Sequence, residues 1–137
     1  MANRILTFVD ASVLIYAANK PTAATLARRL RALQVLGDPD REFLASEFVR
    51  LEVLPIPLYY QRSREIGFYQ KFFASIALWA ESTSLMKPAY TLASQFGLGA
   101  LDALHIATAA AHNAELISAE KPTKPIYRAY TNITSIY

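Results

Sequence analysis

Two long uncharged stretches of the chain each contain a single aspartate. Asp10 is the only formal charge between Ile5 and Asn19, and Asp102 is the only one from Pro88 to Ala114. Segments this apolar pack into the interior, so we expect both carboxylates at the edge of the core or below it. Removing an unpaired carboxylate from water costs several kcal/mol. Two such charges in one small protein suggest a shared cation.

The elements that must position these acids are strands alternating with helices. Short β-branched and aromatic runs predict strands at 5–9, 42–45, 76–79 and 115–118, and a last one within 129–137. Apolar spacing, Gly and Pro predict helices at 11–18, 22–36, 46–53, about 55–62, 66–73, 83–96 and 99–113. Alternation of this kind is typical of an α/β fold, here a Rossmann-like one with four to five mostly parallel strands flanked by helices.

Four acids are expected at one edge of this sheet. Asp10 ends the first strand, and Glu120 follows the strand at 115–118. Asp102 lies in the first turn of a helix capped by Gly99, and Glu52 lies in the helix that begins at Ser46. Ligands of parallel α/β sheets bind outside the carboxyl ends of the strands, and right-handed crossovers bring helix starts to the same rim.

Such a cluster of carboxylates needs a counter-charge. Two carboxylates ~4 Å apart repel by roughly 4 kcal/mol at an effective dielectric constant near 20. Oxygen ligands without cysteine favour Mg²⁺ or Mn²⁺. A metal of this kind activates water and neutralises charge during in-line displacement at phosphorus. The acids therefore predict hydrolysis of a phosphodiester in nucleic acid.

Four motifs resemble those of the PIN-domain nucleases. Phe8-Val-Asp-Ala-Ser-Val-Leu-Ile15 is similar to the opening motif, and Ser46-Glu-Phe-Val-Arg-Leu-Glu52 to the second. Leu101-Asp-Ala-Leu-His-Ile-Ala-Thr-Ala109 resembles the third and is the most specific. Leu116-Ile-Ser-Ala-Glu120 stands where the fourth is expected, with Glu120 in place of the family's usual Asp. The resemblance spans Ile5 to about Lys124, and its order and spacing are similar to those of the compact VapC-type toxins.

This resemblance implies a metal-dependent ribonuclease acting on single-stranded RNA. It assigns metal binding and catalysis to Asp10, Glu52, Asp102 and Glu120. It gives supporting or substrate contacts to Ser12, Ser118 and Lys121. It also implies an antitoxin protein as a partner and a homodimer as the assembly.

Each residue also has a simpler interpretation. Asp10 and Ser12 are both suited to capping the following helix, and Asp102 to interacting with its own helix N-terminus. Glu52 and Glu120 could be solvated side chains. Lys121, Lys124 and Arg128 could equally contact RNA phosphates or lie in a solvated loop. His105 is interpreted first as a buried core histidine rather than as a base. The aromatic residues between 59 and 79 are interpreted first as part of the core and of an interface. Stacking against RNA bases is their functional alternative.

Two other functions share some of these features. A PIN-fold module that binds RNA or protein with weakened catalysis is favoured by Glu120 and the unusual loop after it. A haloacid-dehalogenase-like phosphotransferase also begins with Asp at a strand end. It requires a second Asp two residues later, where this chain has Ser12, so it is set aside.

Composition limits the class of protein. The 137 residues are expected to form a single PIN-like domain, and only 18% of them are charged. The net charge of +3 suits a phosphate-bearing partner. There is no cysteine, no apolar run suited to spanning a bilayer, and the first apolar run breaks at Asp10. We therefore expect a cytoplasmic protein without membrane association.

Overall fold

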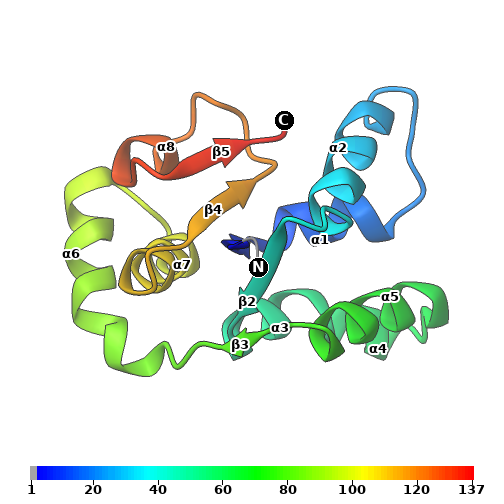
Figure 1. Ribbon diagram of the computed structural model, residues 1–137, viewed down its shortest axis with the longest axis horizontal. Helices are drawn as coiled ribbons and strands as arrows, with labels where there is room; N and C mark the ends of the chain where they lie inside the picture. The colour runs from blue at the N-terminus through cyan, green and yellow to red at the C-terminus, as the bar shows by residue number, and fades with distance from the viewer. Residues whose placement is uncertain (1–2) are drawn as a thin grey trace.

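The computed structural model describes residues 3–137. Its strands are β1 (Ile5–Val9), β2 (Arg41–Ala45), β3 (Leu78–Trp79), β4 (Glu115–Ser118) and β5 (Ile133–Ser135). Its α-helices are α1 (Ala11–Ala18), α2 (Leu26–Leu36), α3 (Glu47–Val53), α4 (Pro55–Tyr59), α5 (Ser63–Ala74), α6 (Met86–Phe96), α7 (Ala100–Ala111) and α8 (Ile126–Ala129). A 3₁₀ turn, η1 (Thr83–Leu85), precedes α6. The elements alternate along the chain as an α/β protein requires (Figure 1).

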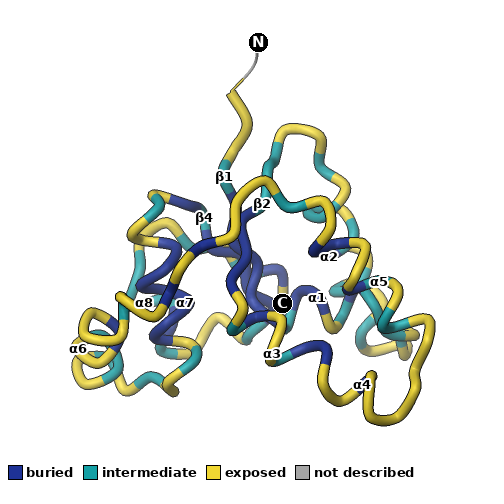
Figure 2. The backbone as a smooth tube through the Cα atoms, turned by 90° about the horizontal axis from the view of Figure 1, so that it is seen from below, coloured by how far each residue is buried: buried dark blue, intermediate teal, exposed yellow. Residues whose placement is uncertain are grey.

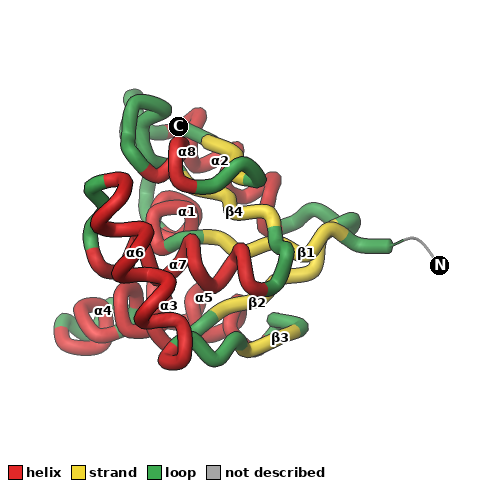
Figure 3. The backbone as a smooth tube through the Cα atoms, turned by 90° about the vertical axis from the view of Figure 1, so that its left-hand side faces the viewer, coloured by secondary structure: helices red, strands yellow, loops and turns green. Residues whose placement is uncertain are grey.

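The five strands form one sheet in the order β3-β2-β1-β4-β5, and every neighbouring pair is parallel. The first four strands of this order can be followed side by side in Figure 3. β1 is central, and the strand order reverses between β1 and β4, which is the place where parallel α/β sheets bind ligands. This confirms the predicted Rossmann-like fold and makes the sheet wholly parallel.

Helices cover the sheet on both sides. Helices α6 and α7 lie on one side and α1 and α2 on the other, with α3 to α5 continuing below them (Figure 1). A sheet covered in this way needs apolar residues on both of its faces, which explains why β1 is uncharged and apolar except for Thr7. Phe8, Val9, Leu44 and Leu116 are accordingly almost completely buried, and the buried segments run through the middle of the molecule (Figure 2).

Several boundaries differ from the sequence prediction. Strand β3 has only two residues. Helix α2 begins at Leu26 rather than at residue 22, because the residues from Thr22 form a turn in which the Thr22 N–H donates to the Thr25 hydroxyl. The short helix α8 was not predicted. Ser46 occupies the expected N-cap position of α3, but its hydroxyl makes no capping hydrogen bond. Gly97 ends α6 in the left-handed conformation (φ 70°), as its position predicted.

Candidate active site

Asp10 lies directly after β1 and is 7% exposed. Its backbone N–H donates to the Ile117 carbonyl at 3.1 Å, which joins it to the end of β4. Its carboxylate caps α1 by accepting from the Ser12 N–H at 3.1 Å and also contacts the Ser12 hydroxyl. Capping and a functional role are therefore compatible, because the second carboxylate oxygen takes no part in these contacts.

Burial raises the pKa of Asp10, and the hydroxyls of Ser118 and Ser12 oppose this by stabilising the anion. The charge of His105 also favours the anion, while that of Asp102 disfavours it. Asp10 and Asp102 lie 92 positions apart in the sequence, yet they share one electrostatic environment. The sheet therefore brings together the two acids that stood alone in their apolar stretches.

Asp102 is the third residue of α7, and it is exposed at the rim of the site. Loss of part of its hydration raises the pKa of this carboxyl, and the charges of Glu120 and Glu52 raise it further. His105 and Lys124 act in the opposite direction. Asp102 thus interacts electrostatically with all three of the other predicted acids. Glu120 and Glu52 raise its pKa, and its own charge raises the pKa of Asp10.

Glu52 projects from α3 and is held by His105 of α7. The Nε2 atom of His105 is hydrogen-bonded to Oε1 of Glu52. His105 is 2% exposed, and its ring packs against Phe8 with 5.3 Å between the centroids. It is therefore the buried histidine that the sequence suggested, and it has a polar partner within the acidic cluster. Its second nitrogen, Nδ1, is buried without a hydrogen-bond partner.

The Glu120 segment is tied to the site by its backbone. Its N–H donates to the Ser118 hydroxyl at 3.1 Å. Its carbonyl accepts from the Tyr127 hydroxyl at 2.6 Å and from Ser135 at 3.1 Å. One step earlier, the Ala119 N–H donates to the Ser12 hydroxyl at 3.0 Å. Ser12 therefore connects the start of α1 to the residue after β4, and Ser118 holds the turn that leads to Glu120.

Tyr127 is not assigned to the site from the sequence, and Lys124 is considered there only as a contact for RNA phosphates. Tyr127 comes from α8, and the charge of Lys124 lowers the pKa of Asp102. No local pattern marks Tyr127, because it reaches the site only through the segment that returns to β5. The approach of a basic residue is visible only in three dimensions. Lys121, which was expected to contact substrate, is exposed on the same loop.

The donor chemistry of the cluster fits a hard divalent cation, since it consists of carboxylates that repel one another. The side chains are not arranged as a finished ligand set. Among residues 3–137, no three Asp, Glu or His side chains are gathered closely enough to form a metal-binding group. Glu52 is engaged with His105 instead. The four acids are thus close enough to influence one another's pKa, but within residues 3–137 their side chains do not converge on one coordination site.

A family model described as the PIN domain matches residues 7–124, which include all four motifs. The chain belongs to the PIN domain family. The resemblance noted in the motifs is confirmed. None of the curated protein sequences compared with this PIN domain matches it.

Solved structures with the same fold include toxin–antitoxin proteins. A toxin–antitoxin complex from Klebsiella pneumoniae matches with a TM-score of 0.72 and 17% identity, covering 96% of this chain and 98% of that one. VapBC2 from Rickettsia felis, bound to a DNA fragment from its promoter, matches with a TM-score of 0.66 and 15% identity over the same shares. A Pyrobaculum aerophilum protein has a TM-score of 0.67 at 13% identity, covering 99% and 93%. At these identities the likeness establishes the PIN fold.

Within the described residues, the helices are too short or too polar to cross a bilayer.

Proposed function

We propose that this PIN domain is a metal-dependent endoribonuclease that hydrolyses phosphodiester bonds of single-stranded RNA in the cytoplasm. One observation carries the proposal. Acids from four separate segments act on one another at the carboxyl edge of a PIN sheet. Retaining mutually repelling carboxylates beside a buried core costs stability, which a bound cation offsets.

The residues have distinct roles in this proposal. Asp10, Asp102, Glu52 and Glu120 would hold Mg²⁺ or Mn²⁺. The cation supplies activation of water and neutralisation of charge at the scissile phosphate. Ser12 and Ser118 orient Asp10, since the hydroxyls of both act on its carboxylate. Exposed Lys121 and Lys124 supply positive charge for the RNA backbone.

The test is cleavage of labelled single-stranded RNA with and without Mn²⁺. We expect wild type to cleave only with metal and Asp10→Asn to lose at least about 100-fold in rate, because a ligand with negative charge is removed. In EDTA the variant should melt at an equal or higher temperature. Burial disfavours the Asp10 anion, and Asn keeps an oxygen for capping. An Asp10→Asn enzyme with full activity refutes the assignment.

A second candidate is a PIN module that binds RNA or protein with weakened catalysis. The engagement of Glu52 with His105 and the lack of a three-ligand group among residues 3–137 favour it. RNA binding without metal-dependent cleavage selects this alternative.

A protein partner is part of the proposal, as an antitoxin and as a second copy in a homodimer. Large apolar side chains are exposed on and just after α3 and α4: Leu51, Ile56, Leu58, Tyr59 and Tyr60. A contiguous surface of this type normally has a partner. The toxin–antitoxin assemblies that share the fold support the antitoxin. Growth arrest on expression, relieved by the product of an adjacent small reading frame, tests it.

A further inference from the structure

A cleft of about 580 Å³ adjoins the acidic cluster. Ser12 forms part of its wall and contacts the Asp10 carboxylate, so the cleft and the candidate active site share a boundary. Glu120 lies on the same wall. A chain bound in this cleft would therefore contact Glu120 and lie next to Ser12, which contacts Asp10.

The cleft carries a cation held between two aromatic rings. The Arg28 guanidinium lies 3.9 Å from the centre of the Tyr137 ring and 5.6 Å from that of Tyr16. One of its nitrogens, Nη1, donates to the Tyr16 hydroxyl at 3.1 Å. The chain end is fixed as well, because Arg31 Nε donates to the Ile136 carbonyl at 2.8 Å. Arg28 is therefore oriented before any ligand arrives, which lowers the entropic cost of using it.

The charges of the cleft favour an anion. Arg28, Lys121 and Lys124 line it together with one acid, Glu120. Within residues 3–137, none of these three cations has a carboxylate partner within ion-pair distance. Apart from the bond of Arg28 Nη1 to Tyr16, their N–H groups are thus available to solvent or to a ligand. Aromatic rings beside cations that lack a carboxylate partner are the combination that single-stranded nucleic acids bind, through phosphate and base together.

We propose that this cleft is the subsite for a nucleotide flanking the scissile bond of single-stranded RNA. Arg28 and Lys124 contact its phosphate, and the partly exposed ring of Tyr137 offers a surface for its base. This inference rests on the proposed function and deepens it by assigning the residues that position the substrate. An acidic peptide could satisfy the cations but has no base to stack.

The test measures binding rather than cleavage. Fluorescein-labelled single-stranded RNA is titrated with the full-length Asp10→Asn protein, and fluorescence anisotropy gives Kd at several salt concentrations. Adding Arg28→Met should raise Kd about 10-fold. It should also reduce the slope of log Kd against log salt concentration by about 1, as for one lost phosphate contact. Adding Arg28→Lys should have a smaller effect, because the charge remains. Lys124→Met provides a second loss of charge that leaves the aromatic packing unchanged.

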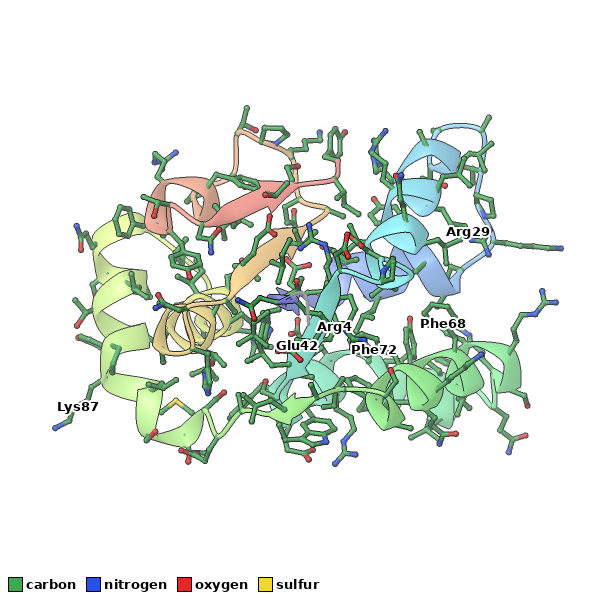
Figure 4. The ribbon with its side chains drawn as sticks, viewed as in Figure 1. Arg4, Arg29, Glu42, Phe68, Phe72 and Lys87 are labelled. Carbon is green, nitrogen blue, oxygen red and sulfur yellow. The ribbon has the colours of Figure 1, made fainter. Side chains whose placement is uncertain are left out.

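Lys87→Met is the matched control, since it removes the same charge at a remote place. Lys87 projects from α6 at the end of the molecule opposite α2 (Figure 4), and Kd should not change. The subsite is overturned if Arg28→Met and Lys124→Met both bind RNA as tightly as their parent. It is equally overturned if the parent does not bind RNA or prefers a poly-glutamate peptide. Failure of the proposed function is recognised separately, as wild-type protein that binds RNA but does not cleave it with Mn²⁺.

Discussion

At the scale of single residues, the site depends on how each carboxylate is held. Asp10 is fixed by the first turn of α1 and by Ser12. Glu52 is fixed by one hydrogen bond from a different helix, through His105. Groups that orient metal-binding carboxylates typically change metal affinity 10- to 100-fold when they are removed. His105 is therefore interpreted as a positioning residue that acts through Glu52.

His105→Leu removes the donor while keeping a side chain of similar size. Because Glu52 loses its anchor, we expect the Mn²⁺ concentration for half-maximal cleavage to rise by about 10-fold or more. His105→Gln, whose amide can still donate, should recover part of this loss. A purely structural role predicts a lower melting temperature in both variants, with no change in the metal dependence of either.

At the scale of elements, a cluster of charged and hydroxyl side chains joins four strands at the end of the sheet opposite the acids. Arg41 of β2 donates to Thr7 Oγ1 of β1 at 3.0 Å and to Glu115 Oε1 of β4 at 2.6 Å. The side chains of Arg41 and Glu115 are 15% and 17% exposed. Burial opposes ionisation of Glu115, but the hydrogen bonds from Arg41 and Thr134 prevail, and the pKa of Glu115 lies below its ordinary value.

Glu115→Gln should destabilise the protein by about 1.5–3 kcal/mol at pH 7, the range for hydrogen bonds to charged groups. A carboxyl with a depressed folded-state pKa contributes stability above its ordinary pKa near 4.5. That contribution is lost as the pH falls through the lower folded-state value. The free energy of unfolding, measured with urea, should therefore be higher for wild type than for the variant at pH 7, and this difference should disappear in acid.

Glu47→Gln is the control for this measurement. Glu47 pairs with Arg50 on the surface, with 66% of its side chain exposed. Exposed pairs contribute about 0–1 kcal/mol. An equal loss in both variants would contradict the structural role assigned to the Arg41–Glu115 pair.

At the scale of the whole molecule, cation binding and folding are linked. A ligand that binds only the folded state stabilises it by about 2.7 kcal/mol at 100 times its Kd. Relief of repulsion around Asp102 is one source of that preference, because Glu120 and Glu52 both raise its pKa. The acidic cluster should therefore make the thermal stability of the entire domain depend on the metal.

Millimolar Mn²⁺ should raise the melting temperature of wild type by several degrees in differential scanning fluorimetry. Asp102→Asn should start from an equal or higher melting temperature in EDTA and gain less from Mn²⁺, since both the repulsion and a ligand are lost. Glu47→Gln should respond like wild type. If neither Mn²⁺ nor Mg²⁺ shifts the wild-type transition, the metal assignment fails.

Local patterns in the sequence determined the type and order of most elements. β1, β4 and the helices that carry Glu52 and Asp102 follow from apolar spacing and from end signals such as Gly97 and Gly99. The four motifs also determined the family, because they bring particular residue types to a strand end and to helix starts. This information is local, since a strand end or a cap depends on neighbours within a few positions.

Only the tertiary structure decided which side chains meet. The Glu52–His105 contact joins residues 53 positions apart, and Arg28 reaches Tyr137 across 109 positions. Helix α8 carries Tyr127, which donates to the Glu120 carbonyl. This helix has only four residues, which is too short for a periodic apolar pattern that would predict it. Contacts of this kind follow from how helices pack on a parallel sheet, and that packing is set by the whole core rather than by any one segment.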